Sequence, residues 1–477
     1  MSIKKNFIYN IAYQILLIIL PLVTAPYVSR VLGANGVGLY SYYNSVVKYF
    51  SLFIMLGVNN YGNRSIAIVK NDKNKLASTF WGIYSLQFFM SIIIVIMYII
   101  YCYFVVGDNK IIAIIQIITI LSYMLDINWF YFGMEEFKLT VSRNFVIKIS
   151  TFIFVLIFVK NRSDLNKYVL IMSLGTCLGN LYLWIKLRKY VNFIRISIKD
   201  IIIHIKPNIS LFIPVIAVSL YRIMDKIMLG IFSTTEQVGF YENSEKIINM
   251  PLGLITALGT VMLPRVSNII SKDINLVKNY ISKSLEFSMF MAFAITFGLI
   301  AVANNFSVIF FGNEFLECGK IITFLSPTVI LVAWANVIRT QYLLPNKNDK
   351  FYTISVCLGA VINVLLNLIF IPKLGAVGAA IGTLFTELSV AIYQTWCVRR
   401  QLEIKKYIKN TLKFMLSGIV MYISIINIGK IIENNIERML IQVISGVLVY
   451  ACFVILCYMF ESKIKNKVAN DRVKPSR

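Results

Sequence analysis

The chain has 477 residues, of which 58% are hydrophobic and only 14% are charged, and its mean hydropathy is +0.74. Since a soluble protein carries about 25% charged residues, this composition excludes a soluble multidomain protein and indicates an integral membrane protein. The net charge of +25 would suit a nucleic acid, an anionic lipid surface or an anionic substrate, and composition alone does not choose among them.

The sequence lacks the residues that common enzyme classes need. It has a single histidine, His204, whereas zinc hydrolases, Ser-His-Asp triads and haem sites require histidines in roles that one copy cannot fill. It also has no CxxC pair, no GxxxxGK[ST] loop and no GxGxxG motif after a strand. We therefore expect no catalytic site, no metal site and no cofactor, and we do not expect ATP-driven transport by this chain alone.

Membrane spans dominate the chain from end to end. About 20 apolar residues are needed to cross the hydrocarbon core, and the stretches that satisfy this are 8–31, 38–61, 77–106, 111–133, 142–159, 168–185, 209–232, 238–261, 284–310, 320–344, 351–371, 376–398, 411–430 and 439–460. The first stretch is too long for a signal peptide, so we expect it to remain as a span. The sequence predicts an all-α polytopic membrane protein with about 14 transmembrane helices.

The distribution of Lys and Arg predicts the orientation. With the N-terminus placed in the cytoplasm, the inner loops and both tails hold 31 of the 47 basic residues, whereas the outer turns hold 9. Cytoplasmic loops carry the excess of Lys and Arg, so we expect both termini in the cytoplasm. The outer turns are at most about ten residues long, which disfavours a membrane glycosyltransferase or polymerase with an external catalytic loop.

An internal repeat relates the two halves of the chain. Residues 37–40 read Val-Gly-Leu-Tyr and residues 238–241 read Val-Gly-Phe-Tyr, an offset of 201. Leu-Gly pairs precede these motifs, and a third Leu-Gly stands at 374–375. A basic amphipathic connector at 191–208, which we expect to lie on anionic membrane lipids, separates the halves.

Prolines stand at matching places in the two halves. Pro21 and Pro26 are predicted to interrupt the first span, and Pro214 the equivalent seventh span. Interrupted helices at matching places favour a central cavity between the halves, with ordinary packing kinks as the alternative.

Charged residues inside the spans are the candidate site residues. Each costs on the order of 2.5–3.5 kcal/mol at the centre of a span, so each is expected to face a partner or an aqueous cavity. The candidate bases for binding an anionic head group such as a diphosphate are Arg30, Lys48, Arg222, Lys226 and Arg339. The acids that could couple to protons or Na⁺, or pair with these bases, are Asp126, Asp225, Glu242, Glu245 and Glu387, and Glu286 is a sixth acid within the spans.

Two interpretations of the charges in spans 7 and 8 stay open. Arg222 and Lys226 share one helix face, and both could pair with Asp225 or Glu242. Glu242 could instead pair with Lys246 on its own helix. Pairing across the two helices would only hold them together, whereas bases that line a cavity would bind the substrate.

Several motifs resemble one membrane transporter family. The segments PYVSRVLGANGVGLYSYYNSVVKYF (26–50), IFFGNEF (309–315) and GAVINVLLNLIFIPKLGAVGAAIGTLFTE (359–387) are similar to those of the polysaccharide transporter branch of the multidrug/oligosaccharidyl-lipid/polysaccharide exporter superfamily. The resemblance covers nearly the whole chain. Its last motif is the most specific, and the Gly and Ala residues there allow tight helix packing.

The resemblance implies two pseudo-symmetric six-helix lobes, 1–190 and 209–400, joined by the connector, with two further helices and a basic tail at 401–477. It also implies a flippase that moves undecaprenyl-diphosphate-linked oligosaccharides across the bacterial inner membrane by alternating access, for O-antigen, capsule or exopolysaccharide assembly. The implied partners are the lipid-linked oligosaccharide, a polysaccharide polymerase and chain-length proteins, and no nucleic acid. A multidrug or cation exporter and a lipid II flippase of the same superfamily remain the alternatives.

Overall fold

The computed structural model describes residues 3–270 and 272–473, and the described residues form helices and no strand. They divide into two compact units, Met1–Glu242 and Asn243–Arg477. The helices that lie wholly in the first unit are α1 (Ile3–Met55), α2 (Val58–Val69), α3 (Lys73–Phe104), α4 (Lys110–Ile115), α5 (Ile117–Met124), α6 (Asn128–Gly133), α7 (Phe137–Phe158), α8 (Leu165–Leu187), α9 (Ile198–Ile202) and α10 (Ile205–Phe232). The remaining helices are α11 (Thr235–Ile269), which begins in the first unit, α12 (Ile274–Phe311), α13 (Glu317–Leu325), α14 (Thr328–Ile338), α15 (Asp349–Val398), α16 (Ile404–Ile431) and α17 (Asn435–Val473).

The helices confirm the predicted fold class. Among the described residues, 10 helical segments are long and apolar enough to cross a membrane, and an eleventh is added if the bent pair Ile198–Phe212 and Val215–Phe232 is one span. The segment Asp349–Val398 counts once, although Gly375 divides it into two arms. The chain is an all-α polytopic membrane protein, and the number of 14 spans stays a prediction. The predicted lobe limits also stay a prediction. The lobes are defined by the sequence repeat, whereas the two compact units are defined by which residues lie close together in space, so the units do not test the lobe limits.

Glycine, and not proline, breaks the first helix. The prediction that Pro21 and Pro26 interrupt it is wrong, because α1 continues through both and leaves helical geometry only at Gly33, with φ 70° and ψ 178°. A proline bends a helix but keeps right-handed φ, whereas only glycine adopts such a positive φ without strain. Gly375 makes the equivalent break in α15, with φ 55°. The bend of 55° in α10 between Phe212 and Val215 is where the sequence predicts it.

The two copies of the repeated motif meet in the first unit. A Cβ added to Gly38 would lie 1.7 Å from the carbonyl oxygen of Thr235, and one added to Gly239 would lie 2.2 Å from that of Ala34. The second arm of α1 and the first turns of α11 therefore cross with their backbones in contact. Glycine is the residue that permits such an approach between helices in an apolar environment.

The repeat also appears in the caps of the helices that follow. Asp72 accepts hydrogen bonds from the backbone N–H groups of Asn74 and Lys75 at the start of α3. Asp273, which is 201 residues later, does the same at the start of α12, with N–O distances of 2.9 and 3.0 Å. The same offset therefore relates the start of a helix in each unit as well as the Val-Gly motifs, which supports an internal repeat.

Polar side chains form hydrogen bonds with the backbone of an interrupted span in the first unit. The segment α4 to α6 is interrupted twice, which leaves backbone carbonyl groups without helical partners. The buried Gln87 amide on α3 donates to the carbonyls of Tyr123 and Asp126, at 3.0 and 2.9 Å, and its oxygen accepts from the Trp129 indole. Such internal satisfaction is what allows irregular backbone at membrane depth.

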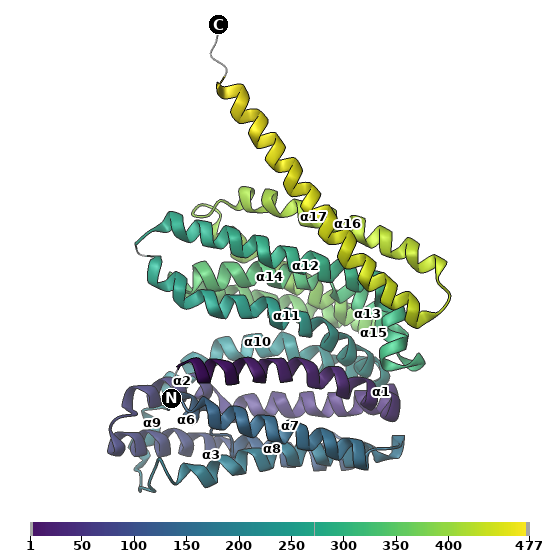
Figure 1. The fold of residues 1–477 in the computed structure, drawn as a ribbon. Coiled ribbons are helices and arrows are strands. Elements are labelled where there is room, and N and C mark those ends of the chain that lie inside the picture. Colours follow the sequence, from purple (N-terminus) through teal and green to yellow (C-terminus); the bar gives the residue numbers. More distant parts are fainter. Residues whose placement is uncertain (1–2, 271, 474–477) are drawn as a thin grey trace. The chain divides into compact units, whose positions relative to one another are not determined.

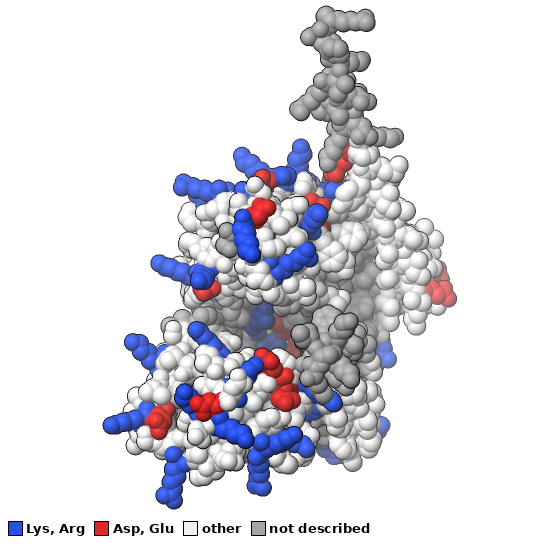
Figure 2. All heavy atoms as spheres, turned by 60° about the vertical axis from the view of Figure 1, so that its left-hand side comes forward, with Lys and Arg blue, Asp and Glu red and all other residues white. Residues whose placement is uncertain are grey.

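Basic loops gather at one end of the first unit. Lys70 pairs with Glu135 at 2.9 Å, and the Trp81 indole donates to the carbonyl of Asn192, so the loops before α3, after α6 and after α8 lie together. Figure 2 shows the Lys and Arg side chains that crowd this end. This common placement agrees with the predicted topology, in which these loops lie on one side of the membrane.

The connector is mostly irregular before α9. Residues 191–197 have no regular structure, and only the short α9 precedes α10. His204 is buried, its Nδ1 lies 2.7 Å from the Tyr61 hydroxyl, and a Cβ on Gly82 would meet its Nε2. The single histidine therefore packs the connector against α2 and α3.

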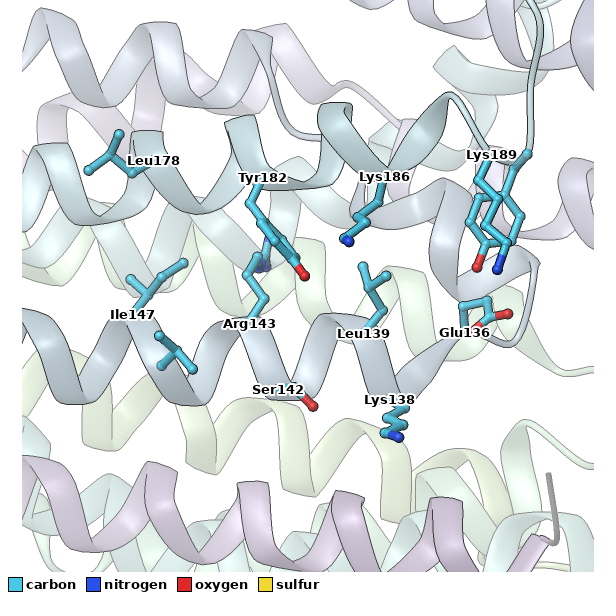
Figure 3. Close-up of a pocket in the computed structure, with 12 residues that line it drawn as sticks. Glu136, Lys138, Leu139, Ser142, Arg143, Ile147, Leu178, Tyr182, Lys186 and Lys189 are labelled. Carbon is cyan, nitrogen blue, oxygen red and sulfur yellow. The ribbon is translucent and has the colours of Figure 1, made fainter.

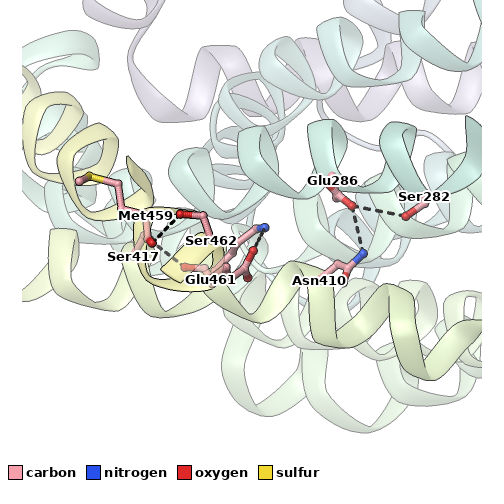
Figure 4. A network of polar contacts seen from close by, with 8 residues as sticks. Ser282, Glu286, Asn410, Ser417, Met459, Glu461 and Ser462 are labelled. Atoms are coloured by element: carbon pink, nitrogen blue, oxygen red, sulfur yellow. Dashed lines mark hydrogen bonds and ion pairs between the residues drawn. The ribbon is translucent and has the colours of Figure 1, made fainter. Parts of the chain in front are cut away.

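In the second unit, α12 packs against α14, α16 and α17 (Figure 1). Two carboxylates link three of these helices (Figure 4): Glu286 on α12 accepts from Asn410 on α16 at 3.1 Å, and Glu461 on α17 pairs with Lys413 on α16 at 3.1 Å. Glu286 therefore has a structural partner in α16, and it is not among the residues we assign to substrate.

Replacing Asp72 by Ala should destabilise the hairpin between α2 and α3. The hydrogen bond from the Lys75 backbone lowers the pKa of Asp72 from its ordinary value of 3.8, so the charged cap stabilises the fold above about pH 4 and loses this effect as the pH falls through the lowered pKa. We expect Asp72→Ala to lower the melting temperature in detergent by roughly 2 °C at pH 7, with the gap narrowing below about pH 4. Asn71→Ala is the matched control, and an equal loss in both variants would contradict the capping role.

A side chain at Gly38 should prevent the crossing of α1 and α11. The added Cβ would overlap a backbone carbonyl, which cannot rotate away, so Gly38→Ala should cost about 1–3 kcal/mol or more. Gly253→Ala in α11 is the control, because nothing lies within 4 Å of the Cβ position there. Size-exclusion chromatography after graded heating should show early aggregation of the Gly38 variant alone. Equal behaviour of the two variants would contradict a tight crossing.

Candidate functional site

A buried ion pair lies beside the glycine crossing. Lys226 Nζ on α10 is 2.6 Å from Glu242 Oε2 on α11, and the side chains are only 12% and 19% exposed. The same Glu242 oxygen accepts a hydrogen bond from the Ser41 hydroxyl on α1 at 2.8 Å. The pair joins three helices of the first unit, and it realises one of the predicted pairings across spans 7 and 8.

A second carboxylate joins the same two helices. Asp225 is 2% exposed, and its Oδ2 accepts a hydrogen bond from the Tyr241 hydroxyl at 2.6 Å. Each acid thus receives a short hydrogen bond from its neighbouring helix. Since charges at this depth need such partners, α10 and the start of α11 are fixed to each other at two successive positions.

Lys48 borders a cavity with polar and apolar lining residues in the same unit. The cavity has a volume of about 420 Å³ and lies where α1 ends and α2 begins, so irregular backbone forms one wall. Its polar lining residues are Lys48, Ser51, Asn59, Asn60 and Tyr123. An exposed lysine among hydroxyl and amide groups can bind an anion and supply hydrogen-bond donors to it.

Two predicted arginines lie in exposed positions near these features. Arg222 is exposed on α10, one residue before Ile223, which lines the cavity. Arg30 is exposed on α1, three residues before the break at Gly33. The structure therefore places Lys48 and the neighbour of Arg222 at one cavity, and it places Arg30 on the first arm of α1.

Asp126 belongs to a polar chain that runs from the segment between α5 and α6 to α7. Its Oδ1 accepts hydrogen bonds from the backbone N–H and the side-chain amide of Asn128. The Asn128 oxygen in turn accepts from Arg143, which is 3.0 Å away. Arg143 lies in α7 and is 8% exposed.

The other predicted residues lie in the second unit. The Arg339 guanidinium lies 5.4 Å from the centre of the Tyr352 ring and opens the π-helical segment Arg339–Leu343. Such π turns are frequent at functional sites. Glu245 and Glu387 are half-buried. The roles of all these residues in binding and coupling stay predictions.

Sequence reasoning missed several residues of the site. Ser41 was not singled out. It lies 201 residues before its hydrogen-bond partner Glu242, so the two residues occupy equivalent positions in the two copies of the repeat. Tyr241 ends the repeated motif, yet its contact with Asp225 depends on how α10 meets α11. Asn59 and Asn60 were not identified, because the candidate residues were chosen for their charge within predicted spans and asparagine is uncharged.

Comparison with known families matches residues 3–270 to the family described as polysaccharide biosynthesis protein. The chain belongs to this family. Its resemblance to polysaccharide transporters is confirmed by a protein of Escherichia coli (strain K12) that is provisionally named an O-antigen transporter. The two sequences are 25% identical over 405 residues, which cover 84% of this chain and 97% of the relative.

Other relatives agree with this placement. A Haloferax volcanii protein, provisionally named a low-salt glycan biosynthesis flippase, is 24% identical over 238 residues, which cover half of each chain. The solved structure of the lipid II flippase MurJ in an inward closed conformation superposes with a TM-score of 0.70 at 18% identity, over 92% of this chain and 98% of MurJ. At this identity the superposition shows a common fold.

Breaking the buried ion pair should be costly, whereas removing both charges should not. Lys226→Met or Glu242→Gln leaves a charge buried without its partner, which costs about 3–5 kcal/mol. The double variant should recover most of that loss, and melting in detergent measures the coupling. Lys320→Met breaks an ion pair whose side chains are 65% and 45% exposed, so it should change little. Additive losses in the double variant would contradict a direct pair.

Proposed function

We propose that this chain is a flippase that moves undecaprenyl-diphosphate-linked oligosaccharides across the bacterial inner membrane by alternating access, with both termini in the cytoplasm. The names of the relatives, an O-antigen transporter and a glycan biosynthesis flippase, support the class of substrate. The observation that carries the proposal is the cavity lined by Lys48 together with hydroxyl and amide side chains in a membrane-spanning unit.

The physical demand of the reaction suits such a cavity. Moving a diphosphate through hydrocarbon without compensation is prohibitive, because burial of an isolated charge costs many kcal/mol. Lys48 and the nearby Arg222 would meet the diphosphate, while hydroxyl and amide groups of the cavity would receive the sugars. Arginine stays charged in a low dielectric and can hold two phosphate oxygens at once.

Release of the substrate requires that the positive charge be moderated. Glu242 neutralises Lys226 at 2.6 Å, so Lys226 would bind the diphosphate only if that pair opens. We propose that protonation or Na⁺ binding at Glu242 or Asp225 opens the pair and so couples an ion gradient to transport. Arg30 and Arg339 would contact the substrate in other stages of the cycle, with Asp126, Glu245 and Glu387 as further coupling candidates.

The partners follow from the same proposal. A flippase delivers its product to the outer leaflet, where a polysaccharide polymerase and chain-length proteins would consume it. A lipid II flippase would use the same diphosphate chemistry with a different sugar. The two functions therefore separate by the sugar and not by the charge of the cavity.

Removing a base proposed to bind the substrate should strongly reduce transport and leave the protein in the membrane. We expect Arg30→Ala, Lys48→Ala and Arg222→Ala each to lower surface polysaccharide at least about tenfold in a strain that lacks its own flippase, since one lost charge-assisted contact is worth roughly 1.5–3 kcal/mol. Arg195→Ala, an exposed arginine in the connector, is the control. Immunoblots of the membrane fraction check expression.

The same variants distinguish the substrate. Reconstituted vesicles should translocate a diphosphate-linked oligosaccharide and should translocate lipid II more slowly. Faster movement of lipid II would favour the alternative. Normal polymer levels in all three variants would contradict the cavity model.

A further inference from the structure

A groove between α7 and α8 has no place in the transport site described above. It has a volume of about 630 Å³, and it lies at the basic end of the first unit. Figure 3 shows its two walls, with Leu139, Arg143 and Ile147 on α7 and Leu178, Tyr182 and Lys186 on α8. The groove is apolar along most of its length and cationic at one end.

Tight packing closes one end of the groove. A Cβ on Gly175 would lie 2.2 Å from the side chain of Thr151, and one on Gly179 would lie 2.3 Å from that of Ile147. α7 and α8 therefore touch at this pair of glycines on α8. The groove occupies the space between the same two helices from there toward the basic loops.

The open side of the groove belongs to an apolar outer surface. Few residues of α7 are buried, and Val146 and Leu178 at the groove are each 61% exposed. In a polytopic membrane protein such a surface faces acyl chains. The part of the groove near Leu178 therefore suits hydrocarbon.

The cationic end carries three exposed lysines. Lys138 is on α7, Lys186 is near the end of α8 with its Nζ 5.6 Å from the centre of the Tyr182 ring, and Lys189 follows α8. Glu136 is the one acid in the lining, so the positive charge dominates. Lys186 lies eight residues beyond Leu178, roughly 12 Å along the helix, which is a suitable distance between a phosphate group and the upper part of an acyl chain.

The floor between the two parts is rigid. Arg143 lies there at 8% exposure, and its guanidinium donates to the carbonyl of Gly179 and to the amide oxygens of Asn180, Asn128 and Asn144. These bonds fix the ends of α7 and α8 to each other below the lysines. A fixed cationic groove of this kind between membrane helices suits an anionic lipid head group.

We propose that this groove is a binding site for one anionic phospholipid of the bilayer, with its phosphate at Lys138, Lys186 and Lys189 and one acyl chain along Val146, Ile147 and Leu178. The proposal is independent of the transported substrate. A partner helix would cover the apolar outer face but would not need the cluster of lysines. Charge and shape together therefore favour a lipid.

The test measures which lipid the purified protein retains. We would reconstitute the full chain in nanodiscs with equal amounts of phosphatidylglycerol and phosphatidylcholine, and count the bound lipids by native mass spectrometry. The triple variant Lys138→Gln, Lys186→Gln and Lys189→Gln should lower retention of phosphatidylglycerol by roughly tenfold or more. The matched control, Lys110→Gln, Lys160→Gln and Lys430→Gln, removes three exposed lysines that lie outside both the groove lining and the connector, and it should retain the lipid.

A second pair of variants tests the acyl chain. Leu178→Trp should fill the groove and reduce retention at least several-fold, whereas Leu181→Trp, on the same helix at 40% exposure and outside the lining, should not. Both positions are exposed, so the fold should tolerate tryptophan.

Four outcomes would overturn the proposal. These are equal retention by the two triple variants, equal retention by the two tryptophan variants, displacement of the lipid by millimolar inorganic phosphate, and preferential retention of a polyisoprenyl diphosphate added in trace amount. The last two would assign the groove to free phosphate or to the transported carrier lipid. The expected pattern, with loss only in the groove variants, would assign it to bulk anionic phospholipid.

Discussion

Charges that lie in an apolar environment must be paired, and this constraint organises the first unit. Lys226 and Glu242 are 2.6 Å apart and mostly buried, so neither could stay ionised there alone. Their pairing holds α10 against α11, and Ser41 adds α1 to the same contact. Any function of these charges in transport has to work by exchanging partners within this set.

Close helix approach depends on glycine at two separate places. Gly38 and Gly239 let the repeated motifs cross with their backbones in contact, and Gly175 and Gly179 do the same for α7 and α8. In lipid, helices gain little from burying apolar side chains, so close packing and hydrogen bonds hold them together. The first crossing places the ion pair, and the second leaves the groove that opens toward the basic loops.

The large positive charge of the chain divides into parts with different roles. In the first unit, basic loops meet at one end, where they suit the positive-inside rule and contact with anionic lipid. Two basic residues lie elsewhere: Lys48 borders a cavity, and Lys226 lies in a buried ion pair. The lysines of the groove between α7 and α8 share features of both groups. They lie at the basic end of the unit, and they also line a groove that could bind a ligand.

The sequence by itself determined the helical membrane fold, the repeat at an offset of 201 and the family. Hydropathy, charge asymmetry and motifs depend only on the order of residues in the chain. It also named Glu242 among the partners open to Lys226. Only the tertiary structure decided that Glu242 is the partner of Lys226, that α1 continues through Pro21 and Pro26 and breaks at Gly33, and that Arg143 is buried in a groove floor. The physical reason is that pairing, backbone breaks and burial depend on which helices touch, and local sequence does not encode those distances.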